Sequence, residues 1–299
     1  MLRARLTPFD VALYAGVVLA WGFSWIALHY QLGVVAPEIS VLWRFALAAP
    51  VMLALAVWQG ESLRFPLTDH LIFVVLGVTL FSSNFTLFYY AGKSITSGLL
   101  PVIFSLASVI NVWLGALVLG TPVDRRVVAG GTLGFFGVAA MFFPQLSGAN
   151  INHAVLIGIG LCIVGTLSFC VGNMISARLQ KRGVPVFAAS GWSMMYGAVT
   201  LALFAVLRGE AFVIEPTFIY VTGLVYLALV ASVIAFGCYL TLLGRIGADR
   251  AAYSTVMFPV VALAVSTALE GYIWTIPAVL GLLAVLAGNL LVLRPAARG

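Results

Sequence analysis

The feature that most constrains this chain is a series of apolar stretches with almost no charge, each about as long as a lipid bilayer is thick. Residues 11–28 and 71–90, for example, are apolar on all sides rather than along one face. Roughly 20 such residues span the hydrocarbon core, where only a helix or a closed barrel satisfies its own backbone hydrogen bonds. A barrel would show short alternating segments, which these stretches lack. The sequence therefore predicts an all-α integral membrane protein.

The composition agrees with a membrane protein and excludes a water-soluble domain. Of the 299 residues, 63% are hydrophobic and 8% are charged, whereas a soluble domain is closer to half apolar and a quarter charged. The net charge of +6 contains no basic run longer than two residues, so it does not indicate nucleic-acid binding. Cys162, Cys170 and Cys238 all fall inside apolar stretches and are expected to pack there without disulfides.

Charges and turn residues divide the chain into ten apolar segments that are joined by short connections. We expect transmembrane helices near residues 10–30, 37–58, 70–92, 95–119, 127–144, 154–177, 186–207, 217–243, 250–270 and 276–293. Because every connection is short, no separate soluble domain is expected.

The distribution of basic residues predicts the orientation in the membrane. With a cytoplasmic N-terminus, the two termini and four loops on that side carry twelve of the fifteen Lys and Arg residues. The outer loops carry only Lys93 and Arg208, and Arg44 lies within the second helix. Because cytoplasmic loops are enriched in Lys and Arg, both termini are expected in the cytoplasm.

The chain also resembles itself at an interval near 150 residues. Trp43 and Trp192 are 149 residues apart, each in the second helix of its half, and the closing Pro144 and Pro295 are 151 apart. Five helices per half is an odd number, so the second half enters the membrane in the opposite orientation. Inverted repeats of this kind are typical of secondary transporters, which bind substrate between the halves.

The predicted architecture is therefore ten transmembrane helices in two inverted five-helix repeats around a central cavity. The first repeat is expected over residues 1–147 and the second over residues 148–299.

Short motifs in these helices resemble those of the drug/metabolite transporter superfamily, in its EamA-type branch. Residues 19–25, Leu-Ala-Trp-Gly-Phe-Ser-Trp, are similar to the W-G-x-x-[FW] signature, and residues 43–49 to the R-F-x-x-A-A pattern. Residues 168–174 resemble a degenerate copy of the first motif. Pro259 and the later Leu269-Glu270 resemble the end of the family's ninth helix. The fourth helix departs from this pattern, with Val109 in place of proline and Gly120 where an acid is common.

The resemblance covers nearly the whole chain and implies a transporter rather than an enzyme. Family members that resemble this chain export amino acids and related metabolites from bacteria, and the aromatic content is similar to that of the bacterial aromatic amino acid exporters. Arginine outnumbers lysine thirteen to two, as in GC-rich bacterial genomes. The expected function is export of aromatic or large neutral amino acids across the bacterial inner membrane, by alternating access and as a facilitator or exchanger.

Other functions remain open at this point. Relatives in eukaryotes carry nucleotide sugars or sugar phosphates, so transport of nucleotide sugars, nucleosides, or other metabolites and drugs is the alternative. A channel is more remote, and so is an intramembrane enzyme, which would need a nucleophile–base pair or an acid pair in mid-membrane. No carboxylate falls in the middle of a predicted helix. We therefore expect facilitated diffusion or exchange, or coupling through a group at a helix end.

Polar and aromatic side chains in the predicted helices are the candidate substrate-binding residues, because a polar group at the bilayer centre needs a partner. An aromatic pocket with a few polar groups suits an amino acid with an apolar side chain. The candidates are Trp21, Ser24, Ser83, Asn84, Tyr89, Asn111, Trp113, Ser168, Asn173, Trp192, Tyr196, Tyr226, Tyr239 and Tyr253. The alternative for a serine is a bond to its own helix backbone, and for an aromatic residue an anchor at the membrane interface.

Arg44 is the one charged residue clearly within a predicted helix. It either binds a carboxylate or phosphate of the substrate, or it snorkels to the outer surface or pairs with an acid at a helix end. Pro101 and Pro259 each remove a helical hydrogen bond, so they are either bending points for transport or static kinks.

The remaining motifs concern metals, cofactors and oligomers. No cluster of His, Cys, Asp and Glu has the spacing of a metal site, so neither a metal nor a cofactor is expected. Gly130 and Gly134 form a G-x-x-x-G motif, followed one turn later by Gly137. This motif packs helices within one chain or mediates dimerisation, so monomer and homodimer both remain open. The expected partners are a small-molecule substrate and the lipid bilayer.

Overall fold

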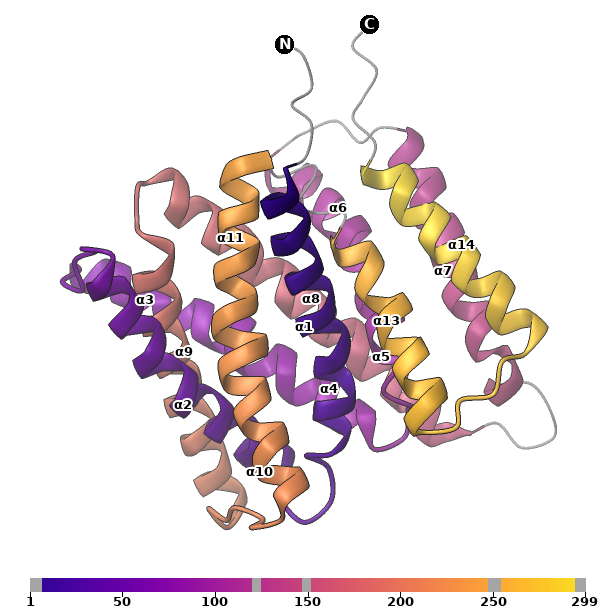
Figure 1. Ribbon diagram of the computed structural model, residues 1–299, viewed down its shortest axis with the longest axis horizontal. Helices are drawn as coiled ribbons and strands as arrows, with labels where there is room; N and C mark the ends of the chain where they lie inside the picture. The colour runs from indigo at the N-terminus through magenta and orange to yellow at the C-terminus, as the bar shows by residue number, and fades with distance from the viewer. Residues whose placement is uncertain (1–6, 120–124, 147–151, 247–253, 294–299) are drawn as a thin grey trace, which may run out of the picture.

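The computed structural model describes residues 7–119, 125–146, 152–246 and 254–293, and within these ranges the chain is helical with no β-strand (Figure 1). Seven of the described helical spans are long and apolar enough to cross a membrane, and three shorter apolar helices accompany them. The prediction of an all-α, multi-pass membrane protein is therefore confirmed.

The first half of the chain follows the predicted segments closely, apart from breaks in the third and fourth. Its elements are α1 (Pro8–His29), α2 (Pro37–Trp58), α3 (Leu67–Leu76), the π-helix η1 (Gly77–Ser83), α4 (Asn84–Gly92), α5 (Leu100–Phe104), α6 (Ala107–Leu119) and α7 (Arg125–Leu146). The elements α3, η1 and α4 form one continuous span.

The second half, like the first, contains a π-helix between two α-helices among its described elements. They are α8 (His153–Lys181), α9 (Val186–Arg208), α10 (Phe218–Val225), the π-helix η2 (Tyr226–Ile234), α11 (Ala235–Ile246), α13 (Ser254–Leu269) and α14 (Ile276–Leu293). Here α10, η2 and α11 are continuous with one another. We call the face at which α1 begins and α14 ends the proximal face, and the face at which α1 ends and α2 begins the distal face (Figure 1).

The segment predicted as one helix over residues 95–119 is divided, and this prediction was wrong in detail. Its regular helix begins only at Leu100, and a break separates α5 from α6. Pro101 lies in the first turn of α5, where its missing N–H removes no helical hydrogen bond. Pro259, in contrast, lies inside α13.

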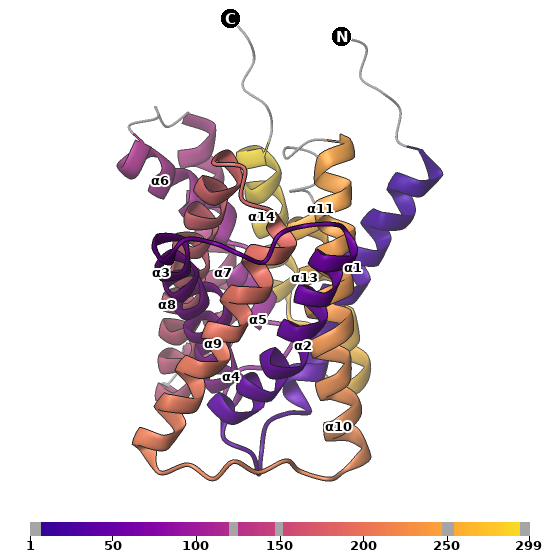
Figure 2. The same ribbon diagram turned by 90° about the vertical axis from the view of Figure 1, so that its left-hand side faces the viewer.

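Helices from the two halves pack against each other in pairs. The helices α7 and α14 lie side by side, with Gly130 opposite Gly288 and Gly137 opposite Gly281 (Figure 1). A Cβ atom on Gly137 would lie 2.6 Å from the Gly281 carbonyl oxygen, so only glycine permits this approach. The G-x-x-x-G motif therefore packs helices within the chain. The helices α2 and α9 form the equivalent pair (Figure 2).

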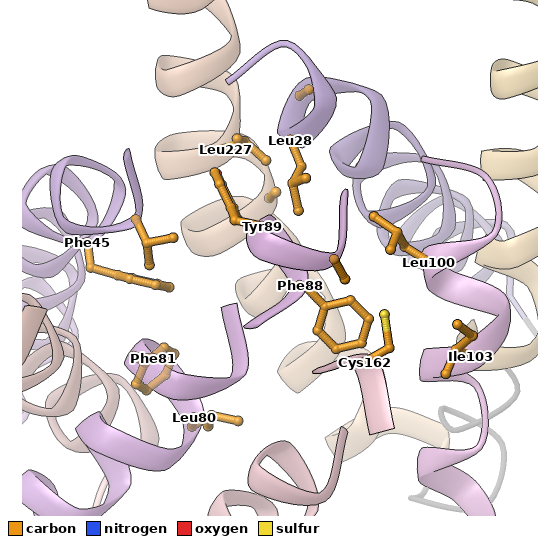
Figure 3. Close-up of a cluster of buried hydrophobic side chains, with 14 of the residues drawn as sticks. Leu28, Phe45, Leu80, Phe81, Phe88, Tyr89, Leu100, Ile103, Cys162 and Leu227 are labelled. Carbon is orange, nitrogen blue, oxygen red and sulfur yellow. The ribbon is translucent and has the colours of Figure 1, made fainter. Parts of the chain in front are cut away.

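The core lies between the halves and is built from residues of both. Phe45, Phe81 and Phe88 of the first half are buried together with Cys162 and Leu227 of the second half. Figure 3 shows the Phe88 ring beside Cys162 and the Phe45 ring above Phe81. The two halves are thus packed against each other through a shared core.

Candidate substrate site

Aromatic rings from six helices meet between the two halves of the chain. This central aromatic cluster consists of Trp21, Trp25, Phe88, Phe104, Phe169, Phe236, Tyr239 and Phe258. Ring centroids are 5.5 Å apart for Trp21 and Tyr239, and 4.6 Å apart for Phe104 and Phe169. Most pairs are edge-to-face or tilted, which is the arrangement that aromatic quadrupoles favour. An apolar side chain of a substrate would find aromatic surface here.

Hydrogen bonds to the π-helix η2 position the aromatic residues of α1. The indole Nε1 of Trp21 donates to the carbonyl oxygen of Ala231 at 3.1 Å. In return, the Tyr226 hydroxyl donates to the carbonyl oxygen of Ala20 at 3.0 Å. A π-helix shifts the regular hydrogen-bond pattern, and such segments frequently occur at functional sites. The Trp21 side chain therefore depends on a backbone feature of the other half.

The first half contains the matching arrangement. The π-helix η1 begins at Gly77 and η2 begins at Tyr226, which is 149 residues later (226 − 77). The hydroxyl of Ser168, on α8, donates to the carbonyl oxygen of Thr79 in η1 at 2.8 Å. In each case a side chain from the first helix of one half binds a π-helical carbonyl of the other half. The interval of 149 residues between the starts of the two π-helices is close to the interval near 150 residues at which the sequence resembles itself.

Arg44 lies beside this cluster and is buried, with 4% of its surface exposed. Its Nε donates to the Ser232 hydroxyl of η2 at 3.0 Å, and its guanidinium carbon lies 4.3 Å from the centre of the Phe85 ring. None of the ion pairs found among the described residues involves Arg44. The side chain thus neither snorkels to the surface nor pairs with an acid in this part of the chain. A buried cation without an anion is costly, so this position favours an anionic ligand.

Two polar groups of α4 have no hydrogen-bond partner of normal geometry among the described residues, and one of them lies close to Arg44. Tyr89 is fully buried and lies close enough to Arg44 for an electrostatic interaction, but its hydroxyl makes no hydrogen bond of normal geometry with a described residue. The Asn84 side-chain oxygen, also buried, has no partner in the described residues either. Leaving a buried polar group unsatisfied costs about 1–3 kcal/mol. A carboxylate could accept from both Arg44 and Tyr89 and give these two side chains a partner, whereas the Asn84 oxygen needs a donor.

The other predicted site residues are divided between this region and places outside it. Trp21, Tyr226, Tyr239 and Ser168 belong to the contacts between the halves described above. Ser24 donates to the Trp21 carbonyl oxygen at 2.7 Å. It therefore binds its own helix backbone, which was the alternative to a substrate-binding role for a serine. Ser83, Asn111 and Asn173 are partly buried, and Tyr253 lies outside the described residues. Trp113 is 49% exposed on α6 and is not part of the cluster.

Trp192 and Tyr196 form a separate group with His70 near the proximal face. The Tyr196 hydroxyl lies 2.9 Å from His70 Nδ1, and Trp192 Nε1 donates to the Leu63 carbonyl oxygen at 3.1 Å. The two aromatic rings stack with centroids 6.0 Å apart. These contacts join α9 to α3 and to the loop before it, so they support a structural role for this pair.

Several residues of the site were not among the predicted candidates. Phe85, Phe104, Phe169, Phe236 and Phe258 carry no polar group, and in the sequence they are indistinguishable from lipid-facing phenylalanines. Only the high aromatic content indicated that some of them would meet. The carbonyl oxygens of Thr79 and Ala231 had no sequence signal, because every residue has a carbonyl group.

Carboxylates at the distal ends of two helices form further contacts between the halves. Glu270, at the end of α13, accepts from the Ser97 hydroxyl at 2.5 Å and lies 3.2 Å from His29 Nδ1. Glu38, at the start of α2, accepts from the Tyr90 hydroxyl at 2.7 Å and lies 3.5 Å from an Arg208 nitrogen. Both carboxylates are buried at the distal face, and each joins residues of the first half to residues of the second.

Comparisons with known proteins agree with this architecture. Residues 9–143 and again residues 156–294 match the EamA-like transporter family. A protein of Salmonella typhimurium (strain LT2) named "Probable amino-acid metabolite efflux pump" is 26% identical over 280 residues, which are 91% of this chain and 90% of that protein. The "Uncharacterized inner membrane transporter YedA" of Escherichia coli (strain K12) is 24% identical over 269 residues, or 89% of this chain and 84% of that protein.

A solved crystal structure shows the same fold. It is 18% identical in sequence, has a TM-score of 0.69, and covers 94% of this chain and 95% of its own. The two family matches together take in nearly all of the chain, and the apolar helices make it a multi-pass membrane protein. The chain therefore belongs to the EamA-like transporter family, within the drug/metabolite transporter superfamily, and is a membrane transporter.

Proposed function

We propose that this chain exports amino acids, with a preference for aromatic or large neutral ones, across the bacterial inner membrane. The observation that carries the proposal is Arg44, a buried guanidinium without a carboxylate partner among the described residues, beside a cluster of aromatic rings. In this proposal the substrate carboxylate binds Arg44 and Tyr89, and the apolar side chain of the substrate lies against the aromatic rings. The name of the Salmonella typhimurium relative agrees with this substrate class.

The number of charges favours an amino acid over a nucleotide sugar. A phosphorylated substrate carries several negative charges and needs several cations at membrane depth, because charge is poorly solvated there. Within the described helices Arg44 is the cation that lies deep in the core, whereas Lys93, Arg182 and Arg208 lie at helix ends. One buried arginine matches the single carboxylate of an amino acid, for which it provides paired N–H donors.

The proposed mechanism is alternating access between two inverted five-helix repeats, residues 1–147 and 148–299, which together provide ten transmembrane helices. We assign the proximal face to the cytoplasm, because twelve of the fifteen basic residues belong to segments on that side. The helix α13 runs from the aromatic cluster, to which it contributes Phe258, to the distal face. There it is followed directly by Glu270, which binds Ser97. A bend at Pro259 would therefore change the site and the distal contacts together.

The test is counterflow into proteoliposomes that contain the purified protein and unlabelled amino acids, with labelled phenylalanine outside. We expect saturable accumulation of label that other aromatic or large neutral amino acids compete away. Arg44→Gln should abolish it, whereas Arg64→Gln, which removes an exposed cation from the loop between α2 and α3, should not. Accumulation that is unaffected by Arg44→Gln would rule out the carboxylate site. No accumulation across a full amino acid panel would rule out the substrate class.

A further inference from the structure

A groove between α6 and α7 lies apart from the central aromatic cluster. It encloses about 300 Å³ and is lined by Val109, Trp113, Val128, Gly131, Thr132 and Phe135. Trp113 is 49% exposed, Val128 45% and Phe135 60%, so the groove is open to the surroundings of the protein. Because these helices cross the membrane, the surroundings at this depth are lipid acyl chains.

The close approach of the two helices forms the floor of the groove. A Cβ atom on Gly131 would lie 2.7 Å from a Val109 methyl carbon, so α6 and α7 meet where α7 has no side chain. The large side chains of Trp113 on α6 and Phe135 on α7 also line the groove and are exposed. The groove is therefore mostly apolar and is lined in part by two aromatic side chains.

A cation lies in line with this groove. Arg125, Val128, Thr132 and Phe135 are spaced by three, four and three residues, which places them on one face of α7. Arg125 is exposed and is the first residue of the helix, at the proximal face. At about 1.5 Å per residue, the groove residues lie roughly 5 to 15 Å deeper in the membrane than Arg125. This distance corresponds to a headgroup followed by the upper part of an acyl chain.

We propose that this groove binds an anionic phospholipid, with the headgroup phosphate on Arg125 and one acyl chain between Trp113 and Phe135. Arginine suits a phosphate because it offers several N–H donors in a fixed plane. Basic residues at the cytoplasmic ends of transmembrane helices bind anionic headgroups, and each contributes about 1 kcal/mol at the membrane surface. Charge complementarity thus selects an anionic lipid over a zwitterionic one, while the groove selects a single chain at a defined place.

The fluorescence of Trp113 can be used to measure lipid binding in the groove, because a brominated acyl chain quenches a tryptophan that it contacts. The full-length protein is reconstituted in phosphatidylcholine vesicles that contain equal fractions of either brominated phosphatidylglycerol or brominated phosphatidylcholine. The chain has seven tryptophans, so the emission of Trp113 is obtained as the difference between the wild type and Trp113→Phe. We expect brominated phosphatidylglycerol to quench this difference emission with an affinity about fivefold higher than that of brominated phosphatidylcholine.

Two charge-matched variants decide whether Arg125 is responsible. Arg125→Gln should remove the preference for the anionic lipid at Trp113, whereas Arg64→Gln, which removes an exposed cation remote from the groove, should keep it. An unchanged melting temperature of each variant ensures that the fold is intact. Equal quenching by the two lipids in the wild type overturns the proposal, and so does a preference that survives Arg125→Gln. Because no substrate is needed, these outcomes are independent of the transport assay.

Discussion

The carboxylate of Glu270 binds Ser97 twice, accepting its hydroxyl at 2.5 Å and its backbone N–H at 3.2 Å. His29 Nδ1 lies 3.2 Å from Glu270 Oε1, so the side chain that directly follows α13 contacts both the end of α1 and the segment before α5. Hydrogen bonds to a charged acceptor are worth about 1.5–3 kcal/mol each, more than bonds between neutral groups. Glu270 therefore stabilises the packing of α1, α13 and the segment before α5 at the distal face.

Replacing Glu270 by glutamine should loosen the segment that it holds. Glutamine keeps the shape but lacks the charge, so backbone amides in residues 93–99 should exchange with solvent about tenfold faster. Hydrogen exchange measured by mass spectrometry on the purified protein provides the test. Glu215→Gln removes a carboxylate from a different distal loop, where it accepts from Thr217, and should leave this peptide unchanged. Identical exchange in Glu270→Gln and the wild type would show that these bonds do not hold the segment.

Replacing Arg44 by methionine should separate function from stability. The variant should lose transport, because the proposed carboxylate partner is gone. Its stability should be unchanged or higher, because replacing a buried charge by an apolar side chain of similar size removes a desolvation cost. Thermal unfolding in detergent and counterflow are measured on the same preparation.

The control for Arg44→Met is Arg182→Met. Arg182 donates to Asp69 at 2.7 Å, and Asp69 is buried, so this variant leaves an unpaired carboxylate and should lower the melting temperature. A clear loss of stability in Arg44→Met would mean that Arg44 has a structural role instead.

Replacing Pro259 by alanine should change the rate of transport more than the substrate affinity. Alanine restores the N–H that proline lacks and straightens α13, so the conformational step becomes slower while the binding residues stay in place. Counterflow over a range of substrate concentrations separates the maximal rate from the half-saturating concentration. Pro50→Ala makes the same change inside α2 at an exposed position and should affect neither quantity. An unaltered maximal rate in Pro259→Ala would identify a static kink.

Replacing Gly137 by leucine should destabilise the folded chain. A Cβ atom at this position would lie 2.6 Å from the Gly281 carbonyl oxygen, so α7 and α14 must move apart. Overpacking of this kind costs about 1–3 kcal/mol or more, and the melting temperature should fall by several degrees. Gly160→Leu is the control, because a Cβ at Gly160 meets nothing within 4 Å. A stable Gly137→Leu with an altered oligomeric state in native mass spectrometry would indicate dimerisation instead.

The positions of most helices could be predicted from the sequence because lipid constrains each residue separately. A charged residue is costly at the bilayer centre, so charges and turn residues gather where the apolar stretches end and mark most ends of the helices. The segments predicted over residues 37–58 and 276–293 have the same limits as α2 (Pro37–Trp58) and α14 (Ile276–Leu293). The break between α5 and α6 was not predicted, because both sides of it are equally apolar.

The candidate site was predicted only in part. Polarity marked Trp21, Tyr226 and Ser168, whose donors bind across the interface between the halves. The same criterion also marked Trp113, which faces outward, because an amphipathic aromatic residue suits a lipid surface as well as a pocket.

The sequence by itself determined that this protein lies in a lipid bilayer, that it is helical, and to which family it belongs. Hydrophobicity, helix length and short motifs are properties of neighbouring residues, so they can be recognised without the tertiary structure. Only the tertiary structure decided which side chains meet. Arg44 lies next to Ser232, 188 residues further along the chain (232 − 44), and its lack of an acidic partner among the described residues follows from that packing. In lipid, the pairing of helices depends on close packing and a few polar contacts rather than on hydrophobicity, so the local pattern cannot specify it.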